Sequence, residues 1–124
     1  MKKNRKDPIT RSFGYAFEGI RTGILKERNM KIHCLAVILV TAAGTFLGLS
    51  AVEWCICLLL FALVISLELV NTAVEAVVDL VTEERKPLAK IAKDTAAGAV
   101  RFASLAAVII GCIIFIPYLA DLFL

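Results

Sequence analysis

Residues 54–81 read WCICLLLFALVISLELVNTAVEAVVDLV. The first fourteen of them, from Trp54 to Leu67, carry no charge. The stretch is longer than the helix of about 20 residues that is needed to cross the hydrocarbon core of a bilayer. Because lipid offers backbone groups no hydrogen-bond partner, the stretch is predicted to be a membrane-spanning helix. Its second half nevertheless carries five polar side chains: Glu68, Asn71, Thr72, Glu75 and Asp79.

These five side chains share one helical face, within a sector of about 100°. Counting about 1.5 Å per residue from Trp54 at the outer interface puts Glu68 roughly 9 Å inside the hydrocarbon. Glu75 then lies at the inner edge and Asp79 in the headgroup layer. A carboxylate at the depth of Glu68 costs at least about 2.5 kcal/mol, and such residues usually face a bundle interior and mark function. A solvated helix end would explain Asp79 and Glu75, but it explains Glu68 poorly.

Two more stretches, residues 32–50 and 96–123, are long and apolar enough to span a bilayer. The whole chain is 60% apolar with a mean hydropathy of +0.84, whereas soluble proteins are about 45–50% apolar. Residues 1–124 are therefore expected to form one membrane domain. Of the 14 Lys and Arg residues, 13 precede the first span or lie in the link 82–94, which predicts a cytoplasmic amino terminus and an outward carboxyl terminus.

Residues 8–28 precede the first span and are expected to form an amphipathic helix on the cytoplasmic surface. Apolar side chains recur there at helical spacing: Ile9, Phe13, Phe17, Ile20, Ile24 and Leu25. The predicted fold is thus all-α, with a surface helix followed by three transmembrane helices. Such a short chain cannot enclose a large core, so oligomerisation is expected. The basic leader suits a membrane surface, and no nucleic-acid partner is predicted.

Three carboxylates and an amide on one face can together hold a divalent cation and accept a proton. Desolvation makes a carboxylate a stronger base, so the deepest, Glu68, is the natural general base, while Glu75 suits a hard cation. A lipid hydroxyl at the headgroup boundary is the substrate within reach. Phosphoryl transfer needs positioning and charge neutralisation, for which four basic residues lie on the same side: Arg85, Lys86, Lys93 and Arg101. The sequence contains no Walker loop and no kinase glycine-rich loop.

The single histidine, His33, lies at the edge of an apolar run and is expected to be an interface residue rather than a ligand. The four cysteines all lie in apolar segments without CxxC spacing. We interpret them as small buried hydrophobes.

A family resemblance is carried by the run Glu68-Leu-Val-Asn-Thr-Ala-Val-Glu75-Ala-Val-Val-Asp79 and by the later pair Lys93-Asp94. These residues resemble the signature of the small prokaryotic integral membrane diacylglycerol kinases. The resemblance extends over nearly the whole chain. Within that family, residues 12–13, 16–20, 26–31 and 96–100 look most like the Gram-positive branch, whose members act as undecaprenol kinases.

The resemblance implies a homotrimer in a bacterial cell membrane that uses Mg²⁺ and ATP to phosphorylate a lipid alcohol, with active sites shared between protomers. It implies that Glu68 is the proton acceptor at the lipid substrate, with Asn71 as a supporting catalytic residue. Glu27 and Glu75 would be metal ligands that also position ATP. The other nucleotide contacts would be Tyr15, Glu84, Arg85, Lys86, Lys93 and Asp94, with Asp79 and Arg11 as candidate supporting residues.

The sequence departs from the family at Arg85-Lys86, where the family has a Tyr-His pair, and near Arg11, where the leader aligns only with a shift. The nucleotide contacts are open at those points.

Two substrates fit this reading. Undecaprenol is favoured by the branch resemblance, and the alternative is a diacylglycerol kinase that makes phosphatidic acid.

Two readings of another class also remain. Intramembrane carboxylates mark transport paths, so a small proton or ion carrier is one alternative, although the charge-free stretch from Trp54 to Leu67 argues against it. The other alternative is a structural membrane subunit, in which neutral substitutions along the polar face would change nothing.

Overall fold

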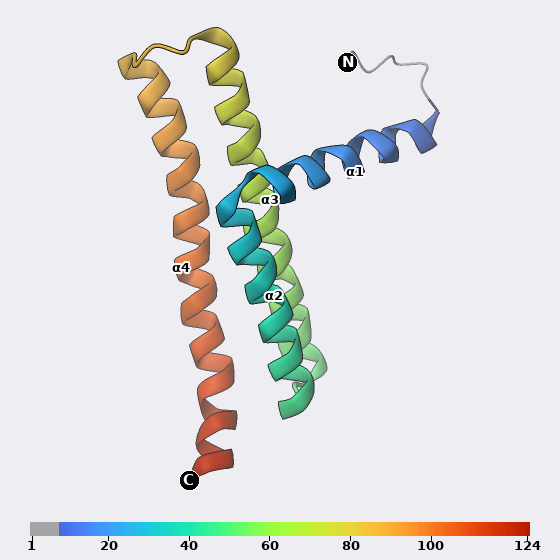
Figure 1. The fold of residues 1–124 in the computed structure, drawn as a ribbon. Coiled ribbons are helices and arrows are strands. Elements are labelled where there is room, and N and C mark those ends of the chain that lie inside the picture. The colour runs from blue at the N-terminus through green and yellow to red at the C-terminus, as the bar shows by residue number, and fades with distance from the viewer. Residues whose placement is uncertain (1–7) are drawn as a thin grey trace.

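The computed structural model describes residues 8–124, and all regular secondary structure in this part of the chain is helical, with no strand. Its helices are α1 (Ile9–Lys26), α2 (Arg28–Leu47), α3 (Ala51–Val81) and α4 (Pro87–Phe123). Helices α2, α3 and α4 run side by side, and α1 leaves the bundle sideways from the end of α2 (Figure 1). The last three are long and apolar enough to cross a membrane. The predicted all-α architecture of one amino-terminal helix and three spans is confirmed.

A tight turn joins α2 to α3. Gly48 adopts the left-handed conformation with φ of 76°, which favours glycine, and the N–H groups of Gly48 and Leu49 both donate to the Gly44 carbonyl. Helix α3 then begins with a capping box, in which Ser50 and Glu53 each accept from the other's backbone N–H. The turn makes α2 and α3 an antiparallel hairpin.

Helix α4 begins at Pro87, ahead of the apolar span that the sequence predicts at 96–123. Proline suits the first helical position, and Lys90 forms an i,i+4 ion pair with Asp94. The first turns of α4 are helical but carry charged side chains, so a span predicted from hydropathy alone leaves them out. The connection between α3 and α4 is consequently short, at residues 82–86.

Helix α3 packs most extensively against α4 and less extensively against α2 and α1. At the end of the bundle that holds the α2–α3 turn, the Tyr118 hydroxyl donates a 2.5 Å hydrogen bond to Oε1 of Glu53. An apolar cluster of Leu49, Cys57 and Ile114 lies beside it. The two longest helices are thus fastened at the end opposite their covalent connection.

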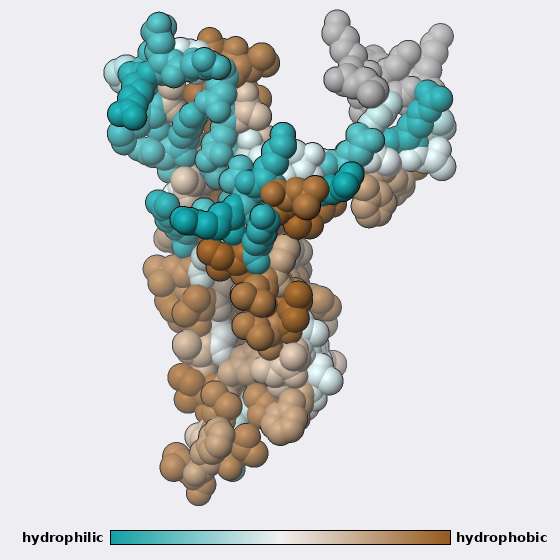
Figure 2. Space-filling model, viewed as in Figure 1, coloured by the Kyte–Doolittle hydropathy of each residue, from teal (hydrophilic) through white to brown (hydrophobic). Residues whose placement is uncertain are grey.

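Few apolar side chains are buried, and most of the large ones face outward along the helices. Figure 2 shows the polar surface gathered over the α3–α4 connection and parts of α1, whereas the body of the bundle is apolar. On α1 itself, Phe13 and Phe17 are exposed. An apolar surface of this extent needs lipid around it, as expected of a multi-pass membrane protein.

Candidate active site

The polar face of α3 runs from a buried end to an exposed end. Glu68 is 2% exposed and Asn71 is 6% exposed, while the side chain of Asp79, nearer the polar end of the bundle, is 58% exposed. Thr72, on the same face, donates its hydroxyl to the Glu68 carbonyl at 3.1 Å. Of the four, only Glu68 and Asn71 are held inside the protein.

A pocket of about 220 Å³ lies beside these two side chains, and we call it the Glu68 pocket. Its polar lining comes from three helices: Asn29 and His33 on α2, Glu68 and Asn71 on α3, and Arg101 and Ser104 on α4. The pocket therefore exists only because the three spans pack together.

Three buried polar atoms of this lining have no hydrogen-bond partner within residues 8–124: Oε1 of Glu68, Oδ1 of Asn71 and Oγ of Ser104. Buried polar atoms in folded proteins are nearly always partnered, because an unpartnered one costs about 1–3 kcal/mol. All three belong to residues that line the same pocket. The arrangement suits a small ligand that donates a hydrogen bond.

The second oxygen of Glu68 faces α2. Its Oε2 lies 3.4 Å from Nε2 of His33, whose side chain is 21% exposed. The sequence reading of His33 as an interface residue missed this contact, because the two residues are far apart along the chain.

Asn71 links the pocket to the next carboxylate, because its Nδ2 donates to Oε1 of Glu75 at 3.4 Å. Glu27, the other predicted metal ligand, is the non-helical residue between α1 and α2 and is partly buried. No cluster of three or more His, Cys, Asp or Glu side chains that could hold a metal ion occurs in the described part of the chain. Mg²⁺ in phosphoryl-transfer sites usually takes one or two carboxylates plus substrate phosphates, so two glutamates fit an ion that arrives with a nucleotide.

A second pocket, of about 650 Å³, lies at the α3–α4 connection, and we call it the Lys93 pocket. Five predicted nucleotide-binding residues line it: Glu84, Arg85, Lys86, Lys93 and Asp94. The family resemblance implied that these residues contact the nucleotide. The short α3–α4 connection brings all five of them to one pocket.

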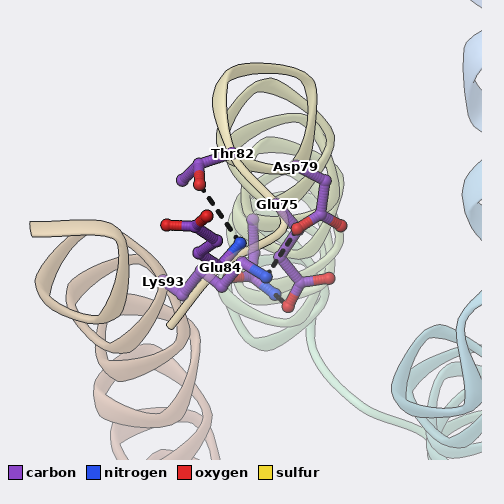
Figure 3. Close-up of polar contacts among 6 residues, drawn as sticks. Glu75, Asp79, Thr82, Glu84 and Lys93 are labelled. Carbon is purple, nitrogen blue, oxygen red and sulfur yellow. Dashed lines mark hydrogen bonds and ion pairs between the residues drawn. The ribbon is translucent and has the colours of Figure 1, made fainter. Parts of the chain in front are cut away.

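The charged groups of the Lys93 pocket pair with nearby side chains. Lys93 reaches from α4 toward α3, and its Nζ lies 2.7 Å from Oδ1 of Asp79, with Glu75 close by in the view of Figure 3. The backbone N–H of Glu84 donates to the Thr82 hydroxyl at 3.1 Å, which shapes the connection (Figure 3). A cationic group is thus held beside the polar face of α3.

Five other predicted site residues line neither pocket. Arg11 and Tyr15 lie on α1, Glu27 lies at the α1–α2 junction, Glu75 contacts Asn71 from the half-buried part of α3, and Asp79 pairs with Lys93. One chain therefore gathers the predicted residues into two groups and leaves Arg11, Tyr15 and Glu27 at its margin.

An apolar groove of about 560 Å³ continues from the Glu68 pocket toward the other end of the bundle, between α2, α3 and α4. The two spaces share Ile32, His33 and Ser104. Beyond these residues the groove is lined almost wholly by aliphatic and aromatic side chains, such as Val37, Phe61 and others of the three spans. A polar headgroup and a hydrocarbon chain would both find a matching surface.

Comparison with known proteins relates this architecture to a family. Residues 14–115 match the family described as prokaryotic diacylglycerol kinase. An undecaprenol kinase of Bacillus subtilis is 44% identical over 117 residues, which cover 94% of this chain and 95% of that protein. A diacylglycerol kinase of Synechocystis is 45% identical over 90% of this chain and 64% of its own length, and one of Escherichia coli is 32% identical over 86% of this chain and 87% of its own length. The chain therefore belongs to the prokaryotic diacylglycerol kinase family and is a multi-pass membrane kinase.

Proposed function

We propose that the protein transfers the γ-phosphoryl group of ATP to the hydroxyl of undecaprenol. The observation that carries this proposal is the Glu68 pocket. It contains a buried carboxylate oxygen without a partner in the described chain, and the pocket itself adjoins an apolar groove. The choice of undecaprenol is supported by the 44% identity to the Bacillus subtilis undecaprenol kinase.

In the proposed reaction, Oε1 of Glu68 takes the proton from the lipid hydroxyl as that oxygen attacks the γ-phosphorus. The bond between the γ-phosphorus and its bridging oxygen breaks, and ADP leaves with the bonding electron pair. The lipid phosphate forms, and the proton later passes from Glu68 to water. Oε1 is suited to this role because it lines the Glu68 pocket and has no other hydrogen-bond partner in the described chain.

The phosphate groups are proposed to lie between the two pockets, with Lys93 neutralising part of their charge. Asn71, which donates a hydrogen bond to Glu75, would hold the metal-ligand carboxylate at a fixed position relative to the proton acceptor Glu68. Bound with ATP, Mg²⁺ would neutralise phosphate charge, with Glu75 and Glu27 as its protein ligands. Tyr15, Asp94 and the stretch Glu84-Arg85-Lys86 are proposed as further nucleotide contacts.

The lipid chain is proposed to lie in the apolar groove, with its headgroup at Ser104 and His33. Ser104 was not among the residues selected from the sequence, since a lone serine in an apolar span gives no spacing signal.

The same proposal includes orientation and assembly. The amino terminus and the α3–α4 connection would face the cytoplasm, where ATP is available, as the distribution of basic residues predicts. A homotrimer would bring Arg11, Tyr15 and Glu27 of one protomer to the pockets of a neighbour, and the large exposed apolar surface of the helices is compatible with such packing.

The test compares purified wild-type protein with Glu68→Gln in mixed micelles, with undecaprenol and diacylglycerol assayed side by side and labelled ATP as donor. Glutamine keeps the size of the side chain but cannot accept the proton, so kcat should fall by about 10²–10⁴-fold. Glu53→Gln, on the same helix at the other end, is the matched control and should keep its activity, because glutamine also serves a capping box.

The outcomes separate the alternatives. Preferential phosphorylation of diacylglycerol would make the protein a diacylglycerol kinase with the same chemistry. Full activity in Glu68→Gln would remove Glu68 as the proton acceptor. An ATP-independent proton leak in liposomes, without phosphate transfer, would favour the carrier, and silence in both assays would leave the structural subunit.

A further inference from the structure

We propose that His33 is a positioning residue for this kinase: it holds one oxygen of Glu68 so that the other faces the lipid hydroxyl. The inference rests on the proposed function and adds a residue to it.

The geometry divides the two carboxylate oxygens of Glu68 between two tasks. Oε2 lies 3.4 Å from Nε2 of His33, whereas Oε1 is buried and has no hydrogen-bond partner in the described chain. A free carboxylate would present either oxygen to a substrate. One held by a donor on α2 presents only Oε1 to the Glu68 pocket, beside Oδ1 of Asn71.

Positioning matters here because the proton acceptor must lie within hydrogen-bond reach of the hydroxyl when that oxygen attacks phosphorus. The side chain of Glu68 has three rotatable bonds. Within residues 8–124, no other side chain forms a hydrogen bond or an ion pair with this carboxylate. His33 thus supplies the contact that restricts the rotation of the carboxyl group.

The surroundings indicate what His33 has to supply. One side chain in the lining of the Glu68 pocket carries a permanent positive charge, the exposed Arg101 on α4. Besides His33 and Glu68, the remaining polar lining consists of Asn29, Asn71 and Ser104. A neutral imidazole with hydrogen on Nε2 is sufficient, because at this position it can donate to Oε2 without adding a charge. The proposal therefore depends on a donor at that position rather than on the protonation of His33.

His33 also lines both the Glu68 pocket and the apolar groove. His33 is therefore located where the proposed polar headgroup meets the hydrocarbon chain, and it contacts Oε2 of Glu68 from α2. A residue that merely filled space at a helix interface would not need a nitrogen directed at the carboxylate.

The test uses two amides of different reach. In His33→Gln the amide nitrogen stands close to the place of Nε2, whereas in His33→Asn it stands close to the place of Nδ1 and falls short of Glu68. His33→Ala removes every donor. Loss of a hydrogen bond to a charged group predicts that kcat falls about 10–100-fold in His33→Ala and His33→Asn, with the KM for ATP unchanged. His33→Gln should recover most of the wild-type kcat.

Thermal unfolding of each variant in detergent accompanies the assay. Equal kcat in His33→Gln and His33→Asn would overturn the proposal, as would wild-type kcat in His33→Ala. A fall of kcat only in proportion to lost folded protein would make His33 structural and would also overturn it. If His33→Ala does not fold, the comparison of kcat between His33→Gln and His33→Asn still tests whether a donor at the place of Nε2 is needed. Failure of the proposed function would look different, since wild-type protein itself would then transfer no phosphate to either lipid.

Discussion

In the Glu68 pocket three buried polar atoms lack a hydrogen-bond partner within the described residues, whereas in the Lys93 pocket Lys93 already pairs with the carboxylate of Asp79. Both pockets adjoin α3, and the distance between them follows from its helical rise. The difference lies in exposure: Glu68 is almost fully buried, and Asp79 and Lys93 are at or near the polar surface.

This contrast separates two kinds of recognition. Buried unpartnered atoms favour a ligand that donates a hydrogen bond and penalise one that does not, so they select a hydroxyl group. Exposed ion pairs contribute little to stability and can exchange partners at small cost, so they suit a highly charged ligand that binds and leaves in each turnover. One helix can thereby serve an alcohol and a nucleotide without mixing the two sites.

The largest effect on this contrast is expected from Asn71→Leu, a substitution that keeps the branched shape of the side chain at Cγ but removes its polar atoms. It removes both the unpartnered Oδ1 and the hydrogen bond to Glu75, so the carboxylate proposed as a metal ligand is no longer held in position relative to Glu68. Misplacement by about 1 Å can cost about 10²-fold, and we expect a loss of that size in kcat. Thr72→Val, which removes only a bond to a backbone carbonyl, is the control and should stay within a few-fold of wild type, about 1 kcal/mol or less. Near-normal turnover in Asn71→Leu would show that the buried atoms do not select the alcohol.

A smaller effect is expected at the Lys93 pocket. Lys93→Met removes a charge-assisted contact worth about 1.5 kcal/mol, so the KM for ATP should rise about tenfold with a smaller change in kcat. Because exposed charges are screened by salt, high ionic strength should narrow the gap between variant and wild type. Lys31→Met, on an exposed part of α2 that lines neither pocket, is the control. A fall in kcat with an unchanged KM would instead assign Lys93 to the transition state alone.

The smallest effect is expected at the lipid-binding side of the Glu68 pocket. Ser104→Ala removes one unpartnered hydroxyl from the Glu68 pocket, and loss of a neutral hydrogen bond of about 0.5–1 kcal/mol should raise the KM for the lipid about two- to fivefold. Ser66→Ala, on α3 and outside both pockets and the groove, is the matched control. An unchanged lipid KM in Ser104→Ala would mean that this hydroxyl does not meet the headgroup.

Sequence patterns predicted the three spans and the burial of Glu68, because hydropathy and the 3.6-residue period are local properties. The start of α4 was less accessible, since the charged turns at Lys90 and Asp94 have the composition of a link while forming a helix. The sequence signal for the earlier start of α4 is Pro87 at the first helical position, and this signal is weaker than hydropathy.

The contact of His33 with Glu68 escaped prediction because it is tertiary. A signal for it does exist in the hairpin: Ser50, at the turn, lies 17 residues after His33 and 18 residues before Glu68. Two antiparallel helices with equal rise hold such residues at the same depth. Asp79 and Lys93 likewise meet across the α3–α4 connection, but at unequal counts, two residues before the end of α3 and six residues after the start of α4.

Polar and covalent links join α4 to α3 near both ends: the connection 82–86 with the ion pair of Lys93 and Asp79 at one end, and the hydrogen bond from Tyr118 to Glu53 at the other. A rod supported at both ends bows most at its centre. The centre of the supported length falls between Val100 and Ser104, the segment of α4 that borders the Glu68 pocket. Flexing of α4 would therefore widen or narrow the entrance for a lipid headgroup arriving sideways from the bilayer, while the supports keep the helix from sliding along its neighbour.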